Sequence, residues 1–334
     1  MKNEELFFLS FTERGRALAE RLRGELGGEA DCARDGIRLR EWTAERFPGA
    51  KALIFVGAAG IAVRAVAPHL VHKADDPAVV CVDEGGSFAI PLVSGHLGGA
   101  NELAREIARI LGATAVITTA TDVNGVFAAD EWARVQGCAI LGTEQIKAVS
   151  GKLLSGEPVE VKTLFPVDGE PPEGVELSDT AEPDVWVDVR PHAGLVVAPR
   201  ALRLGIGCRR GVTKETLEAR FATFCRVSGV LPESIAEAAT IDLKADEKGL
   251  LAFCAGHGWN LKFYSAEELL KAEGTFTASD FVETQIGVDN VCERAAMLSA
   301  GMDGELFVRK FAGEGVTFAL SRRPVRLDWR WRNG

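Results

Sequence analysis

The chain has 334 residues, of which 47% are apolar and 26% are charged, and its formal net charge is −10 at pH 7. This length is enough for two or three domains with their own cores, and the acidic balance argues against a nucleic-acid-binding surface spread over the molecule. The N-terminal apolar stretch is too short for a signal peptide or a membrane span. Seven single cysteines without a CxxC pair argue against a disulfide scaffold or zinc site, so we expect reduced thiols in the cytoplasm.

Predicted strands and helices alternate through the first 130 residues. The expected segments are a strand and helix over 5–28, a strand, turn and helix over 51–70, a strand at 77–82 with its return strand at 87–93, a helix over 101–112, and a β-branched strand within 114–122. In the helix over 101–112, Leu103 and Ile107 are expected to face the core and Arg105 to face water. This alternation predicts a parallel or mixed sheet with helices on both faces.

The alternating pattern weakens over 131–200 and then returns. The middle part combines helical and strand-like stretches with a proline- and acid-rich loop, and the last part ends in a hairpin around the turn at 313–315. The fold class is therefore predicted to be α/β. We expect two Rossmann-like three-layer domains, at 1–130 and 201–325, joined by a small α/β middle segment at 131–200.

Four loops are predicted at the carboxyl ends of strands, where open α/β sheets bind ligands. They read GAAG at 57–60, GHLGGAN at 95–101, TTATD at 118–122 and GIGCRRG at 205–211. Glycine turns before a helix leave backbone N–H groups free to bind an anion. None has strict GxGxxG or Walker spacing, so a plain tight turn is an equal alternative for each.

His96 lies among glycines, so the sequence favours a ligand-facing imidazole that acts as acid or base near neutral pH. Asp83 and Glu84, on the turn upstream, are placed to fold back toward it and orient the ring or activate water. The structural alternatives are a histidine bonded to a carbonyl and two acids in a surface hairpin. Asn101 would bond a ligand or cap its helix.

Two further groups have the residue types of a metal site or a nucleophile. His69 and His72 are spaced for two metal ligands on one helix, but Pro68 and the lack of a third ligand favour a solvated loop. Cys208 stands beside two arginines, which would lower the pKa of a thiol. Because no histidine partner is obvious, the arginines are better interpreted as carboxylate or phosphate clamps.

Long motifs at both ends of the chain resemble one family. VDEGGSFAIPLVSGHLGGANELAREIARILGATAVITTATD, at 82–122, is similar to the signature of the cobalt-precorrin-5A hydrolases, the CbiG proteins of anaerobic cobalamin biosynthesis. GIGCRRG, IDLKADEKGL and GVDNVCERAA are similar to that family's C-terminal domain, which also occurs alone as CobE. The resemblance runs from about residue 5 to 322, and 131–200 matches only in position and size.

The resemblance implies a hydrolase that opens the ring-A δ-lactone of cobalt-precorrin-5A with water and releases acetaldehyde to give cobalt-precorrin-5B. The cobalt belongs to the substrate, so no cofactor and no protein metal site are expected. Glu84 or His96 is expected to activate the water, while amides around Gly95, Gly98 and Gly99 would stabilise the oxyanion. The expected substrate-binding residues are Gly57, Gly60, Asp83, Gly95, Gly98, Gly99, Asn101, Thr118, Thr119, Asp122, Gly207, Cys208, Arg209, Arg210, Lys244 and Glu247.

Two other functions stay open on the residues alone. One is a non-catalytic tetrapyrrole carrier of the same pathway, and the other is a phosphate- or nucleotide-binding α/β enzyme. The expected partner is the cobalt-precorrin substrate, with other cobalamin-pathway enzymes and a homodimer left open and neither nucleic acid nor a membrane expected. The sequence does not show which domain holds the active site.

Overall fold

The computed structural model describes residues 5–72, 75–278 and 287–330. Contacts divide the chain into two compact units: unit 1 comprises 1–134 and 146–157, and unit 2 comprises 135–145 and 158–334. The sequence predicts domain boundaries near residues 130 and 200. The two contact units do not test them, so these boundaries stay a prediction.

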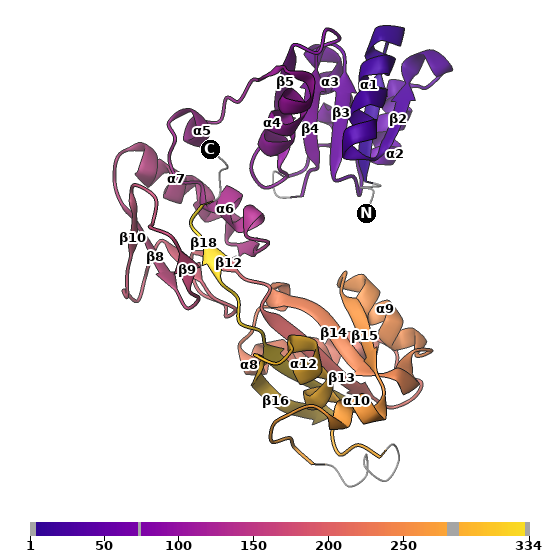
Figure 1. Ribbon diagram of the computed structural model, residues 1–334, viewed down its shortest axis with the longest axis vertical. Coiled ribbons are helices and arrows are strands. Elements are labelled where there is room, and N and C mark those ends of the chain that lie inside the picture. Colours follow the sequence, from indigo (N-terminus) through magenta and orange to yellow (C-terminus); the bar gives the residue numbers. More distant parts are fainter. Residues whose placement is uncertain (1–4, 73–74, 279–286, 331–334) are drawn as a thin grey trace. The chain divides into compact units, whose positions relative to one another are not determined.

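Unit 1 is built on a mixed sheet, of which Figure 1 labels β2, β3, β4 and β5. Its described strands follow the order β2-β1-β3-β4-β5-β6. Their bounds are β1 Leu6–Ser10, β2 Glu29–Cys32, β3 Ala52–Val56, β4 Ala78–Val82, β5 Phe88–Val93 and β6 Thr114–Ala115. β1 to β4 are parallel, β5 is antiparallel to β4, and β6 is parallel to β5. β5 and β6 therefore end at the sheet edge where β1, β3 and β4 begin.

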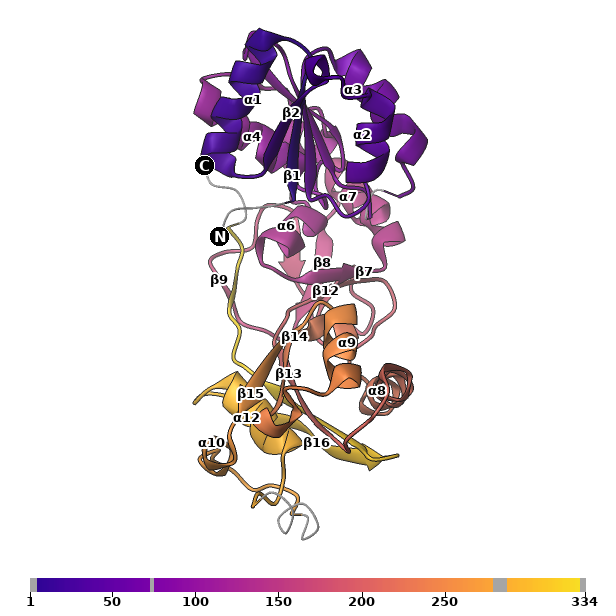
Figure 2. The same cartoon turned by 90° about the vertical axis from the view of Figure 1, so that its right-hand side faces the viewer.

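Helices cover both faces of this sheet (Figure 2). They are α1 Glu13–Leu26, α2 Leu39–Arg46, α3 Ala59–Val66 and α4 Ala100–Leu111. Neighbouring residues of β1 point to opposite faces: Phe8 packs with the α1 and α4 residues Leu22 and Ile107, whereas Leu9 packs with Trp42 and Ala62 of α2 and α3. The α/β class and the two helical layers are confirmed here.

The strand predicted within 114–122 is shorter than expected. β6 stops at Ala115, and Thr119 instead precedes the short helix α5, Ala120–Val123. The β-propensity of the threonines is overridden because Asp122 is held by His96, in the loop before α4, and by Asn101 of α4. The remaining helices of this region are α6 Ala129–Val135 and α7 Ile146–Leu154.

Unit 2 contains two larger sheets in its described residues, ordered β10-β8-β11-β12-β7 and β15-β14-β13-β17-β16, and a small β18-β9 pair. The bounds are β7 Ala139–Leu141, β8 Val159–Thr163, β9 Val167–Asp168, β10 Val175–Leu177, β11 Val185–Val187, β12 Leu195–Ala198, β13 Leu202–Cys208, β14 Ile235–Ile241, β15 Asn260–Tyr264, β16 Glu305–Gly313, β17 Val316–Arg322 and β18 Leu327–Asp328. β13 to β15 are parallel, and β17 runs antiparallel to both β13 and β16. The predicted terminal hairpin is thus confirmed.

The sheet around β13 also has helices on both faces. These helices are α8 Lys214–Ser228, α9 Lys248–Gly256, α10 Ala266–Leu270 and α12 Cys292–Ala300. On one face, three phenylalanines pack against Phe318 of β17: Phe221 of α8 edge-on, Phe224 of α8 stacked and Phe253 of α9 tilted. On the other face α12 lies so close that a Cβ on Gly205 would stand 1.8 Å from the Cys292 carbonyl oxygen. This three-layer arrangement agrees with the predicted fold class. No helix of the described residues is both long and apolar enough to cross a membrane.

Candidate functional site

The two predicted catalytic residues of unit 1 lie at opposite edges of its sheet. Glu84 follows the end of β4, whereas His96 follows the end of β5, which runs antiparallel to β4 with Val82 opposite Ala89 and Val79 near Val93. The six residues of β5 separate the two turns by roughly 20 Å. The expectation that Asp83 and Glu84 fold back toward His96 is therefore wrong, because an antiparallel return strand carries the chain away from the turn.

The turn that carries the acids is held together by them. Asp83 accepts hydrogen bonds from the backbone N–H groups of Ser87 (2.7 Å) and Phe88 (2.6 Å), and Glu84 accepts one from the Thr12 hydroxyl at the start of α1. Gly57, at the same edge, donates its N–H to the Val82 carbonyl, so that donor is not free for an anion. A Cβ at Gly57 would also stand 2.7 Å from Phe11, while Gly60 on α3 is open. Asp83, Glu84 and Gly57 therefore make hydrogen bonds that stabilise the turn and the loops beside it.

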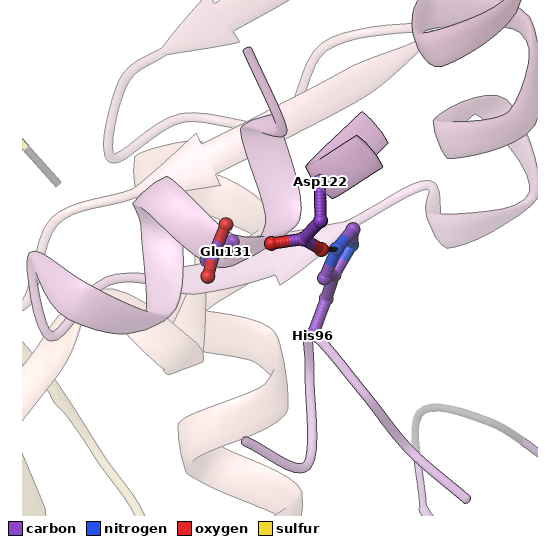
Figure 3. Close-up of side chains that lie close together, drawn as sticks. All are labelled: His96, Asp122 and Glu131. Carbon is purple, nitrogen blue, oxygen red and sulfur yellow. Dashed lines mark hydrogen bonds and ion pairs between the residues drawn. The ribbon is translucent and has the colours of Figure 1, made fainter. Parts of the chain in front are cut away.

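His96 lies at the other edge in a compact polar cluster, shown with Asp122 and Glu131 in Figure 3. Its Nε2 is 2.9 Å from Asp122 Oδ2, and its Nδ1 is 3.3 Å from Asp130 Oδ1. The Thr121 hydroxyl is 3.3 Å from Nε2. The side chain of His96 is only 13% exposed and that of Asp122 only 5%. We call His96, Asp122, Asp130, Glu131 and Arg105 the His96 cluster.

The electrostatics of this cluster favour a protonated imidazole. Burial opposes the charge on the ring, but hydrogen bonds to Asp130 and Asp122 and the negative charges of Asp130 and Glu131 outweigh it and raise the pKa of His96 to about 9. At neutral pH both ring nitrogens therefore carry protons directed at carboxylates. His96 can donate a proton or stabilise negative charge, but in this arrangement it has no free nitrogen with which to act as a base.

The donors around Asp122 suit a carboxylate held by hydrogen bonds. Arg105 pairs with its Oδ1, while Asn101 Nδ2 (3.0 Å), His96 and the Thr119 hydroxyl all point at Oδ2. His96, Asp122 and Glu131 offer ligand atoms within 4.8 Å of one another, which is close enough for a metal ion. However, the Arg105 guanidinium already pairs with both Asp122 and Glu131 (3.4 Å) and occupies the place of a cation. The other groups around Asp122 are hydrogen-bond donors, which use the lone pairs that a metal ion would need. The residues therefore fit a proton better than a metal.

The glycines of the GHLGGAN loop serve close packing more than ligand access. A Cβ at Gly95 would stand 2.8 Å from Asn101 Oδ1, and one at Gly98 would stand 2.5 Å from Ser94 Cβ. Gly99 has φ 81° at the start of α4, and its N–H donates to the His96 carbonyl. The expectation that the Gly99 amide stabilises an oxyanion is therefore wrong, because the loop itself uses that donor. Ser94 is a non-glycine residue with φ 56°, a strained conformation directly before this loop.

The predicted C-terminal loop lines a cavity of about 670 Å³ in unit 2. Its wall includes the cationic residues Arg209, Arg210, Lys244 and Lys310, together with Asn290 and Cys292. Gly207 and Cys208 also line it. We call this space the cationic cavity. The predicted loop residues thus line one space, and their role as carboxylate or phosphate clamps stays a prediction. Lys310 of β16 adds a cation that the loop pattern did not reveal.

Individual contacts refine the expected roles at this cavity. Arg210 is two-thirds exposed and pairs with Asp246 at 3.1 Å, so its guanidinium is shared with that acid. Glu247 accepts a hydrogen bond from Gly211 N–H and lies 3.8 Å from Lys244, so it braces the loop from outside the cavity wall. Burial raises the pKa of the Cys208 thiol to about 11 despite nearby Lys244, which keeps it protonated and disfavours a nucleophile.

Sequence reasoning missed several members of the His96 cluster. Arg105 was expected to face water, but its guanidinium binds Asp122 and Glu131. Asp130 and Glu131 stood at the predicted domain boundary and matched no motif, although two adjacent acids, which the structure places in the first turn of α6, were a visible signal. Of the predicted residues, His96, Asn101, Thr119 and Asp122 do come together. Within the part of the chain that the structure describes, the Thr118 side chain makes no hydrogen bond to the cluster.

Known proteins match this chain at both ends. Residues 41–122 match the family model described as cobalamin synthesis G N-terminal, and residues 202–321 match the one described as cobalamin synthesis G C-terminus. A relative from Salmonella typhimurium called cobalt-precorrin-5A hydrolase is 32% identical, covering 96% of this chain and 98% of the relative. The chain belongs to the cobalt-precorrin-5A hydrolase family.

A second relative covers most of this chain, whereas one solved structure covers about a third of it. This relative, from Priestia megaterium and also called cobalt-precorrin-5A hydrolase, is 32% identical over 83% of this chain and 80% of its own length. The solved structure of CobE, a protein from the cobalamin (vitamin B12) biosynthetic pathway, is 28% identical and covers 36% of this chain and 89% of that chain, with a TM-score of 0.35. Family membership is thus carried by sequence over nearly the whole chain.

Proposed function

We propose that this chain is a hydrolase that opens the ring-A δ-lactone of cobalt-precorrin-5A. Water adds to the lactone carbonyl and the ester C–O bond breaks, giving a carboxylic acid and an alcohol. Loss of the alcohol proton then forms a C=O bond while the C–C bond to the macrocycle breaks. The macrocycle takes up the electron pair and a proton, and acetaldehyde leaves. The observation that carries the proposal is the match to relatives of that name across both halves of the chain.

The cationic cavity supports the recognition of such a substrate. A modified tetrapyrrole bears several carboxylates, and a protein of net charge −10 must hold them with local positive charge. Arg209, Lys244 and Lys310 provide that charge around one space. At about 670 Å³ the cavity is sized for one carboxylate-bearing edge of the macrocycle rather than for all of it.

The His96 cluster supports the acid–base part of the reaction. A protonated imidazole fixed between Asp122 and Asp130 can protonate a departing alkoxide or stabilise an oxyanion. Water activation by His96 fits the geometry less well, because both of its nitrogens face carboxylates. Glu84 lies at the far edge of the sheet and belongs to a rival site, so at most one of these two residues acts at the reacting centre.

The test is acetaldehyde release from cobalt-precorrin-5A by single variants. His96→Asn is expected to lower kcat by roughly 100-fold, which is typical for loss of an acid–base group, and Glu84→Gln is expected to leave it within about threefold. His257→Asn is the matched control, because His257 also pairs with a carboxylate (Glu218, 3.0 Å) but lies in neither candidate site. Loss of activity in Glu84→Gln with normal activity in His96→Asn would move the chemistry to the other edge.

The remaining expectations belong to the same proposal. The reaction is proposed to need no resident cofactor, with cobalt carried by the substrate, and to take place in the cytoplasm. The rival function is that of a carrier that binds the tetrapyrrole without turnover, and the cationic cavity alone would suit it. Tight binding of cobalt-precorrin-5A without acetaldehyde release would favour the carrier.

A further inference from the structure

A fully buried carboxylate stands behind the cationic cavity. Glu293, in the first turn of α12, is 0% exposed. Its oxygens accept hydrogen bonds from Thr277 N–H (2.6 Å), the Thr277 hydroxyl (2.9 Å), Asn290 Nδ2 (2.9 Å) and Lys310 N–H (2.7 Å). All four donors are neutral, and no ion pair to Glu293 is found among the described residues. Such a carboxylate is retained only where its oxygens are satisfied, so it fixes the groups around it firmly.

The contact with Lys310 coincides with an irregularity in β16. Between Val308 and Phe311 the strand takes three steps, while its partner β17 takes two, from Leu320 to Phe318. The extra residue frees a backbone N–H from the ladder, and Glu293 accepts the N–H of Lys310. The bulge also decides which side chain faces which way: Phe311 packs against Phe224 of α8, while Lys310 lines the cavity.

Glu293 also holds a second residue of the cavity wall. Asn290 donates its amide to Glu293 and accepts the Glu293 N–H through Oδ1 (2.9 Å), so the two residues are locked together. Asn290 and Lys310 both line the cavity, whereas Glu293 does not. We propose that Glu293 is a positioning residue for substrate binding, which fixes Lys310 and Asn290 in the wall that receives a substrate carboxylate. This inference rests on the proposed function of the cavity.

The test is a split between KM and kcat for cobalt-precorrin-5A in the full-length protein. Glu293→Gln keeps the size of the side chain, but its amide NH2 group replaces one of the two oxygens that accept hydrogen bonds. The bulge at Lys310 should then be held less firmly. KM is expected to rise about tenfold, the usual scale for one lost charged hydrogen bond, with kcat within about twofold. Glu237→Gln is the control, because Glu237 pairs with Lys262 and Ser299 in the same unit but does not line the cavity. It is expected to lower the melting temperature without changing KM.

A double variant separates positioning from general damage. If Glu293 acts through Lys310, the variant Glu293→Gln with Lys310→Gln should raise KM no further than Lys310→Gln alone. If Lys310→Gln raises KM but Glu293→Gln leaves it at the wild-type value, the inference is overturned and the proposed cavity function stands. If neither Lys310→Gln nor Arg209→Gln changes KM, the cavity function itself fails. Should Glu293→Gln not fold, Glu293→Asp, which is too short to reach all four donors, is measured instead, and a wild-type KM there counts against positioning.

Discussion

At the residue scale, the interpretation of His96 depends on its two carboxylate partners. The ring is held by Asp122 at 2.9 Å and Asp130 at 3.3 Å and is almost buried. A histidine of this kind links the loop at 95–101 to the segment at 119–131 as well as holding a proton. The same proton therefore joins the two segments and is available for chemistry, so both stability and activity should depend on pH.

The raised pKa of His96 makes a prediction about stability. A group with a pKa of 6.5 when unfolded and about 9 when folded stabilises the folded state fully below pH 6.5, and this contribution is lost as the pH rises through 9. Relative to His96→Asn, the wild type should be more stable by on the order of 3 kcal/mol at pH 6, and this gap should nearly close by pH 10. Urea unfolding of both proteins at a series of pH values measures it. A gap that is independent of pH would contradict the protonated cluster.

Sequence reasoning could find His96 but not its environment. The glycine-flanked histidine, Asn101 and Asp122 were visible as a pattern, and the structure does join them. The pattern could not show that both ring nitrogens are occupied, because Asp130 arrives from a segment 34 positions later with no periodic signal. The position of Glu84 was predictable, because the strand expected at 87–93 returns directly after the turn that carries the acids. A return strand of six residues carries His96 away from that turn.

At the element scale, the packing of α12 on β13 positions both residues that Glu293 holds. Strand and helix meet at Gly205, where the side of the strand facing the helix has no room for a Cβ. The hairpin, the alternation of elements and the α/β class were predictable, because each rests on local periodicity. The close approach of α12 to β13 was not predictable, because local patterns do not show that Gly205 is the glycine that faces the helix.

A pair of alanine variants tests this packing. Gly205→Ala places a methyl group about 1.8 Å from the Cys292 carbonyl oxygen, and the backbone shift needed to relieve the clash should cost roughly 1–3 kcal/mol. Gly24→Ala is the control: Gly24 lies in α1 with nothing within 4 Å, so the variant should be stabilised by about 0.5–1 kcal/mol. Melting temperatures of the two variants against the wild type give the answer. An unchanged melting temperature for Gly205→Ala would show that the helix is not held against the strand.

At the scale of the whole molecule, an acidic protein is proposed to bind an acidic substrate through one local concentration of cations. The net charge of −10 opposes binding at long range, while the cationic cavity favours it at short range. Composition alone predicted the first effect, and the loop at 205–211 indicated the second. The contribution of Lys310 emerged only from the fold, since it lies about 100 residues away in a hairpin.

Salt dependence distinguishes the two effects. Raising the ionic strength from 0.1 M to 1 M shortens the screening length from about 10 Å to about 3 Å. If short-range ion pairs with the cavity dominate, KM should rise several-fold across this range, and Lys310→Gln should flatten the dependence. Steady-state kinetics at fixed pH measure both. A KM that falls with salt would mean that relief of the overall repulsion dominates and that the cavity contributes little.

The central claim is that this chain turns over cobalt-precorrin-5A rather than merely holding it. The most direct measurement is the number of acetaldehyde molecules released per protein chain, followed over time with cobalt-precorrin-5A in large excess. We expect steady release well beyond one molecule per chain, with cobalt-precorrin-5B formed in equal amount. Tight binding of cobalt-precorrin-5A with no acetaldehyde would contradict it and would make the protein a carrier.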